Sequence, residues 1–157
     1  MTKGKEKERS NNPHKFFSAN EKQKIIAAIQ TAEKETSGEI RVHLEELSRR
    51  PVFDRAVEVF HTIGMNRTAL KNGVLIYLAT ANKEFAILGD RGINQVVPEN
   101  FWNEITHQLS EQFAQGNFCE GLCESILLIG EKLKTYFPYK TDDQNELSDD
   151  ISIHHEE

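Results

Sequence analysis

The strongest constraint on the fold is a continuous apolar segment at residues 74–79, which reads VLIYLA. Asn72-Gly73 precedes this segment, and the polar residues 80–83 follow it. A run of this length, rich in large and β-branched residues, predicts a central strand that is buried on both faces. Residues 84–88 are typical of a second strand. The short polar connection between the two predicts an antiparallel hairpin.

The segments on either side predict helices and one further strand. Ser18 and Glu21 have the spacing of a capping box, so a helix is expected to begin there. The alternation of Ile40, Val42 and Leu44 with polar residues predicts a strand with one well-buried face. A second helix, capped by Asp54, is expected to connect this strand to the central one, and such a crossover is almost always right-handed and parallel.

These elements predict an α/β fold, namely a three-layer α/β/α sandwich with a small mixed central sheet and helices on both faces. The expected division of the 157 residues is a disordered N-terminal arm at 1–15, one domain at 16–138, and an acidic, mostly flexible tail at 139–157. Within the tail, residues 145–147 and Ile151 are the part that can dock on the domain.

Charge and hydropathy exclude some classes of partner. The net charge is −6 and the isoelectric point is about 5.6, so a nucleic acid is not an expected partner, because phosphate binding needs a basic face. We expect no membrane span and a cytoplasmic location, because no signal sequence and no apolar segment of membrane-spanning length is seen.

The predicted topology brings three separate turns to one edge of the sheet. The two parallel strands begin at this edge and the antiparallel strand ends there, so residues 37–39, 72–73 and 89–92 are expected to converge. Glu39, Asn72 and Asp90 then offer oxygen ligands, the type that Mg²⁺ and Ca²⁺ prefer. Thr68 and Arg91 are possible supporting residues.

Two other interpretations of these residues remain open. In the first, Asp90 pairs with Arg91 or caps a turn, Asn72-Gly73 is a plain turn, and Glu39 is a solvated strand end. In the second, a ligand binds beyond the carboxyl ends of the parallel strands, near Glu45, Glu46 and Asp54, where open α/β sheets usually bind ligands. The common sequence signatures of nucleotide-binding loops, hydrolase elbows and zinc proteases are missing from the chain.

Three motifs taken together resemble the TPM domain family. They are Ser-Gly-Glu-Ile at 37–40, Asn-Gly-Val-Leu at 72–75 and Ile-Leu-Gly-Asp-Arg-Gly-Ile at 87–93. The resemblance covers about residues 16–137 and implies an α/β/α sandwich, a divalent-cation site in a surface crevice, and acid phosphatase activity. It assigns acidic site positions to Glu39 and Asp90. Lys71 stands where relatives often carry an aspartate, which removes one potential ligand.

Two functions follow as hypotheses. In the first, the chain is a stand-alone cytoplasmic TPM domain that binds a divalent cation and acts as a soluble binding or assembly module, with a possible protein partner. In the alternative, it is a metal-dependent acid phosphatase in which Glu39 and Asp90 hold the ion and Arg91 stabilises the phosphoryl charge. The acidic tail is a further candidate for docking on a basic partner.

Overall fold

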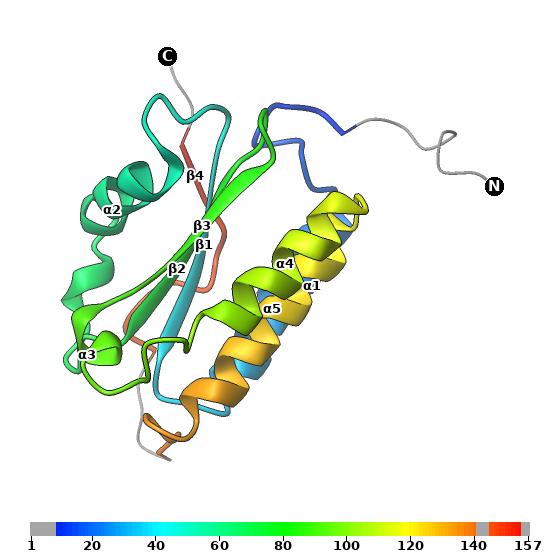
Figure 1. Ribbon diagram of the computed structural model, residues 1–157. Helices are drawn as coiled ribbons and strands as arrows, with labels where there is room; N and C mark the ends of the chain where they lie inside the picture. Colours follow the sequence, from blue (N-terminus) through cyan, green and yellow to red (C-terminus); the bar gives the residue numbers. More distant parts are fainter. Residues whose placement is uncertain (1–8, 141–144, 155–157) are drawn as a thin grey trace.

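A four-stranded mixed sheet forms the centre of the computed structural model, which describes residues 9–140 and 145–154 (Figure 1). The strand order is β3-β2-β1-β4. β1 and β2 are parallel, β2 and β3 are antiparallel, and β1 and β4 are parallel, which confirms the predicted hairpin and parallel crossover. The strands are β1 (Glu39–Glu45), β2 (Gly73–Ala79), β3 (Glu84–Gly89) and β4 (Ser152–His154).

Helices cover both faces of the sheet, which confirms the three-layer sandwich. Three long helices lie on one face and one helix lies on the other, as Figure 1 shows. The first group is α1 (Ala19–Ala32), α4 (Asn103–Ala114) and α5 (Phe118–Leu133), and the opposite helix is α2 (Val52–Thr62). Two single-turn helices, η2 (Met65–Arg67) and α3 (Arg91–Asn94), lie in the connections.

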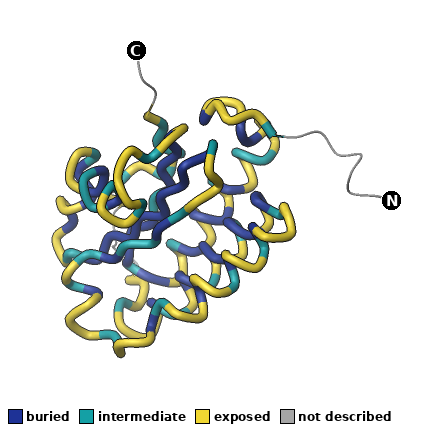
Figure 2. The backbone as a smooth tube through the Cα atoms, turned by 45° about the horizontal axis from the view of Figure 1, so that its top comes forward, coloured by how far each residue is buried: buried dark blue, intermediate teal, exposed yellow. Residues whose placement is uncertain are grey.

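Burial follows the strand alternation on β2. Val74, Ile76 and Leu78 pack in the cluster formed with α1, α4 and α5, whereas Leu75 and Tyr77 pack in the smaller cluster under α2. Every residue of β2 is buried, and Figure 2 shows the buried backbone concentrated in the middle of the molecule. A strand covered on both faces needs no polar side, which explains its continuous apolar sequence.

The starts of the first two helices show one correct and one wrong prediction. The capping box is confirmed, because Ser18 accepts a hydrogen bond from the backbone of Glu21 and the Glu21 carboxylate accepts one from the backbone of Ser18. The expectation that Asp54 caps α2 is wrong. Pro51 has the extended backbone of the cap position, so the helix begins at Val52 and Asp54 lies exposed in its first turn.

The two terminal segments fall partly outside the described residues, at 1–8, 141–144 and 155–157. Within the described part of the arm, Arg9 donates two hydrogen bonds of 2.7 Å to the Glu21 carboxylate. The tail, which we expected to be mostly flexible, contributes β4, and its Ile151 and Ile153 pack on the larger core cluster. Within the described ranges, none of the helices combines the length and apolar character needed to cross a membrane.

Candidate functional site

The three predicted turns do meet at one edge of the sheet, around Gly73. Gly73 is paired with Glu39 of β1 on one side, and its carbonyl accepts a 2.9 Å hydrogen bond from the Asp90 backbone at the end of β3. Glu39, Gly73 and Asp90 are therefore direct neighbours across β1, β2 and the end of β3, and we call this line of residues a row. Because side chains in one row share a face of the sheet, both carboxylates start from the face that α2 covers.

Asp90 serves as the cap of the short helix α3. Its Oδ1 accepts a 2.7 Å hydrogen bond from the Arg91 backbone, whereas its Oδ2 is buried and has no hydrogen-bond partner within the described residues. A glycine at position 92 lets α3 approach the preceding loop, because a Cβ there would overlap the carbonyl oxygens of Leu70 and Lys71. This close contact fixes Asp90 beside the loop that carries Asn72.

Asn72 is 1% exposed and has one unpaired oxygen. Its backbone N–H donates to the Thr68 hydroxyl at 3.1 Å, and its side-chain N–H₂ donates to the Ser37 carbonyl at 3.3 Å. Its Oδ1 is buried and finds no hydrogen-bond partner in the described part of the chain. The turn before it is held by Lys71, which has a positive φ of 53° and donates from Nζ to the Asn66 carbonyl at 2.7 Å.

Glu39 lies at the same edge, but its carboxylate already has partners. It is 4% exposed, and its two oxygens accept hydrogen bonds from the backbones of Glu146 at 3.1 Å and Leu147 at 3.2 Å. Burial raises the pKa of Glu39, and these two N–H groups oppose that rise in part. A Cβ at Gly73 would lie 3.9 Å from Leu147 Cδ1, so the leucine side chain extends over the glycine in the row.

The predicted set is thus brought to one edge, although it is not arranged as a cluster of carboxylates. In the part of the chain that the structure describes, no three His, Cys, Asp or Glu residues are grouped closely enough to hold a metal ion. Within the described residues, the unpaired oxygen ligands of the predicted set are instead the amide oxygen of Asn72 and one carboxylate oxygen of Asp90. Both are hard oxygens, which fit Mg²⁺ or Ca²⁺ and do not fit a thiolate-seeking metal. Thr68 is buried and its hydroxyl is engaged, and Arg91 is exposed.

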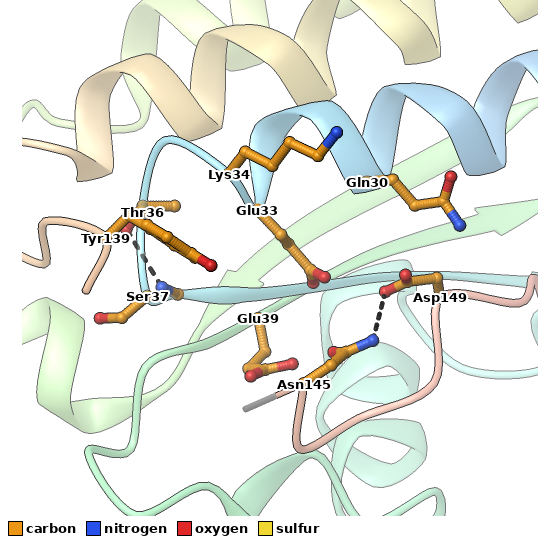
Figure 3. A pocket seen from close by; sticks show the side chains of 10 residues that line it. Gln30, Glu33, Lys34, Thr36, Ser37, Glu39, Tyr139, Asn145 and Asp149 are labelled. Atoms are coloured by element: carbon orange, nitrogen blue, oxygen red, sulfur yellow. Dashed lines mark hydrogen bonds between the residues drawn. The ribbon is translucent and has the colours of Figure 1, made fainter. Parts of the chain in front are cut away.

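A cavity of about 310 Å³ opens beside Glu39, between the end of α1 and the C-terminal residues (Figure 3). Glu33 and Glu39 face Asn145 and Asp149 across it, and the amide of Asn145 donates to Asp149 Oδ1 at 3.1 Å. Glu33 Oε2 accepts a 2.8 Å hydrogen bond from the Ile40 backbone, which satisfies an N–H at the edge of β1. Burial, followed by the hydrogen bond with Asp149, raises the pKa of Glu33 to about 9.

The opposite edge of the sheet carries a buried polar network that sequence reasoning did not find. Arg55 holds both Glu45 oxygens at 2.8–3.2 Å, and the Tyr77 hydroxyl donates to Glu45 Oε2 at 2.9 Å. His43 Nε2 lies 3.7 Å from Glu45 Oε1, while its Nδ1 is 2.8 Å from Ser152 Oγ. Burial opposes ionisation of Glu45, but the hydrogen bonds from Arg55 and Tyr77, together with the nearby His43, outweigh it and lower its pKa to about 2.

The alternative interpretation placed a ligand at this opposite edge of the sheet. Of the three residues named there, Glu45 is buried and paired, whereas Glu46 and Asp54 are exposed. The signal that was available is Tyr77, because a tyrosine inside a fully apolar strand needs a partner for its hydroxyl. Since both of its oxygens are paired, the Glu45 carboxylate holds Arg55 of α2 against the sheet.

Comparisons with known proteins agree with this architecture. No curated protein sequence matches the chain. Several solved structures are similar to it, and three are described here. The NMR structure of the BA42 protein from the psychrophilic bacterium Bizionia argentinensis is 49% identical, with a TM-score of 0.86, and the match covers 92% of this chain and 100% of that one.

Two more distant structures share the fold alone. The N-terminal domain of a protein from P. gingivalis is 20% identical with a TM-score of 0.62, covering 77% of this chain and 78% of that one. The N-terminal domain of the cg2496 protein from Corynebacterium glutamicum is 13% identical with a TM-score of 0.59, covering 90% and 83%. The model of the TPM domain matches residues 10–132, which is most of the sequence. The chain therefore belongs to the TPM domain family.

Proposed function

We propose that this TPM domain binds a divalent cation, Mg²⁺ or Ca²⁺, at the edge formed by Glu39, Asn72 and Asp90, and acts as a binding or assembly module. The observation that carries the proposal is the pair of buried, unpartnered oxygens, Asn72 Oδ1 and Asp90 Oδ2, within the described residues. Leaving a buried polar oxygen unpaired costs about 1–3 kcal/mol, and a bound ion would supply the missing partner.

The surroundings support the same proposal. The two oxygens belong to residues on either side of Gly73, whose carbonyl is bonded to the Asp90 backbone. The loop that carries Asn72 is fixed by Thr68, Lys71 and the contact with α3, so the donors are held in place before any ion arrives. Arg91 is exposed at the rim, where a cationic side chain can meet an anionic group of a partner.

The hydroxyls of two threonines at this edge are engaged in structural hydrogen bonds, which favours a binding role over a hydrolytic one for these side chains. Thr68 accepts the Asn72 N–H, and Thr36 donates to the Phe137 carbonyl and accepts the Gly38 N–H. Both side chains therefore position backbone. A nucleophile for an acid phosphatase would have to come from elsewhere, for example from a water molecule on the ion.

Isothermal titration of the full chain with CaCl₂ and with MgCl₂ tests the proposal. We expect Asp90→Asn to weaken binding at least tenfold, because it removes the one free carboxylate charge, and Asn72→Ala to weaken it less. Asp54→Asn is the matched control, since Asp54 is an exposed carboxylate near the start of α2. Equal affinity of the wild type and Asp90→Asn would overturn the proposal.

The phosphatase alternative has one supporting observation, the exposed Arg91 next to Asp90. If it holds, Asp90→Ala and Arg91→Ala should each reduce hydrolysis of p-nitrophenyl phosphate by at least tenfold in the presence of the cation. Hydrolysis at the same rate by wild type and both variants would exclude this role for the edge.

A further inference from the structure

Residues 145–154 form a segment, here called the C-terminal strap, that runs along the open side of β1. It begins beside Glu39 at the start of the strand and ends as β4, paired with His43, Leu44 and Glu45. The strap lies beyond residue 132, where the match to the TPM domain ends. It therefore adds to the family's domain a segment that lies directly on one of the proposed ligands.

The strap occupies the Glu39 carboxylate by its backbone. Successive N–H groups of Glu146 and Leu147 each bind one oxygen of Glu39. The positive ends of two N–H dipoles thus face the atoms that a cation would use, and a cation at the same place would be repelled by them. A third contact anchors this turn, as Glu146 Oε2 accepts a 3.3 Å hydrogen bond from the Ala69 backbone.

The strap also fills the space over the middle of the site. Leu147 packs in the cluster under α2 and extends over Gly73, which separates Glu39 from Asp90 in their row. Leu147 thus adds an apolar side chain, beside Met65, at the glycine that separates Glu39 from Asp90 in the sheet. Release of the strap would remove this leucine from the face on which Glu39 and Asp90 lie.

Acidic groups of the strap lie against acidic groups of the domain, which weakens the docking of the strap. Glu146 and Asp149 of the strap lie beside Glu33 and Glu39, with Lys34 and Tyr139 lining the same cavity (Figure 3). Acidic groups thus dock on acidic groups, and burial together with Asp149 raises the pKa of Glu33 to about 9. At the far end only three residue pairs join β4 to β1. A short pairing of this kind at the edge of a sheet can open separately from the core.

We propose that the C-terminal strap and the divalent cation compete for Glu39, so that the strap closes the cation edge and its release frees Glu39 to join Asn72 and Asp90. This inference rests on the proposed function, because it concerns the regulation of the same site. It assigns the strap the role of an internal competitor. Any partner that draws the strap away would strengthen cation binding, and cation binding would expose the strap by the same coupling.

The experiment combines amide NMR and hydrogen exchange on the full chain, with CaCl₂ or MgCl₂ as the only added ligand. We expect saturating cation to shift the amides of Asn72 and Asp90 and to speed exchange at Glu146 and Leu147 at least tenfold, while Val42 and Ile76 in the core exchange unchanged. Leu147→Pro, which removes one N–H donated to Glu39 and the side chain over Gly73, should bind the cation about tenfold more tightly. Leu127→Ala, in a half-exposed leucine of α5, is the matched control and should bind as the wild type does.

The outcomes separate the two proposals. Shifts at Asn72 and Asp90 without faster exchange in the strap, and with equal affinity for Leu147→Pro, would overturn the competition and leave the cation site standing. Weaker binding by Leu147→Pro would overturn it as well, because the strap would then contribute to binding. If neither protein shows shifts at Asn72 and Asp90, the cation site itself is wrong. The exchange measurement on the wild type keeps the test valid even if the proline variant fails to fold.

Discussion

At the scale of single residues, one glutamate on β1 and one directly after α1 show that burial can accompany opposite shifts in the pKa of a carboxyl group. Glu45 is buried against Arg55 and Tyr77, so its pKa falls to about 2. Glu33 is half-buried beside Asp149, and burial followed by the hydrogen bond with Asp149 raises its pKa to about 9. Neither behaviour was predicted from sequence, because Arg55 is ten residues from Glu45 and the strap is more than one hundred residues from Glu33.

We predict that Glu45→Gln lowers the free energy of unfolding at pH 7 by about 3 kcal/mol, because it leaves Arg55 without its main partner in a buried setting. Glu58→Gln is the matched control on the same arginine, and should cost under about 1 kcal/mol because the Glu58 side chain is 38% exposed against 7% for Glu45. Urea unfolding measures both. Similar costs for the two variants would contradict the assignment.

The pKa of Glu45 also fixes a pH dependence. The pKa of Glu45 in the folded state, about 2, lies below its ordinary value of 4.5. The stabilisation that ionised Glu45 gives the folded state is therefore present above pH 4.5 and is lost as the pH falls toward 2. We therefore expect wild-type stability to fall through this range more steeply than that of Glu45→Gln. Parallel curves of unfolding free energy from pH 5 to pH 2 would show that the pair is not formed.

For Glu33 the sign is reversed. The pKa of Glu33 in the folded state, about 9, lies above its ordinary value of 4.5. The stabilisation that protonated Glu33 gives the folded state is therefore complete below pH 4.5 and is lost as the pH rises through 9. Glu33→Gln should therefore stabilise the chain by at least about 1 kcal/mol at pH 8, measured by urea unfolding in buffer with a chelator. Glu35→Gln, at a half-exposed glutamate paired with Lys134, should leave the high-pH slope unchanged.

At the scale of elements, the strands differ in how well the sequence predicts them. β2 and β3 were predictable because an apolar run, a polar turn and an alternating segment follow one another directly. β4 was missed because three residues in an acidic tail give almost no strand signal; only the spacing of Ile151 and Ile153 indicated it. The pairing partner of β4 is the edge of β1, which lies far away in the chain, so tertiary contact decides its conformation.

The short helix α3 positions Asp90 relative to Asn72, and one glycine makes this possible. We predict that Gly92→Ala costs at least about 2 kcal/mol and shifts the Asn72 amide, because the added methyl overlaps the backbone of Leu70 and Lys71. Gly116→Ala is the control: its φ of +83° adds strain, but nothing lies within 4 Å, so about 1 kcal/mol is expected. Chemical unfolding and an amide spectrum distinguish the two; an unchanged Asn72 amide in Gly92→Ala would contradict this role for α3.

At the scale of the whole molecule, the layered architecture and the edge where the turns meet were both predictable, whereas the covering of that edge was not. The alternation of Ile40, Val42 and Leu44 and the apolar run of β2 predicted two parallel strands, which place Glu39 beside Gly73, and the predicted hairpin places Asp90 on its other side. That Glu39 accepts backbone N–H groups from residues 146 and 147 depends on how the tail folds back, which carries no motif. Of the three predicted ligands, Asn72 and Asp90 each keep one unpaired oxygen within the described residues.

In the proposed function a divalent cation binds between Asn72 and Asp90. The most direct measurement is a titration of ¹⁵N-labelled full chain with CaCl₂ and MgCl₂, followed through the backbone amides and the side-chain N–H₂ of Asn72. We predict saturable shifts that are largest at Asn72, Gly73, Asp90 and Arg91 and that disappear in Asp90→Asn. Shifts confined to the Glu45 edge, or a response that stays linear and unsaturated in wild type and variant alike, would contradict it.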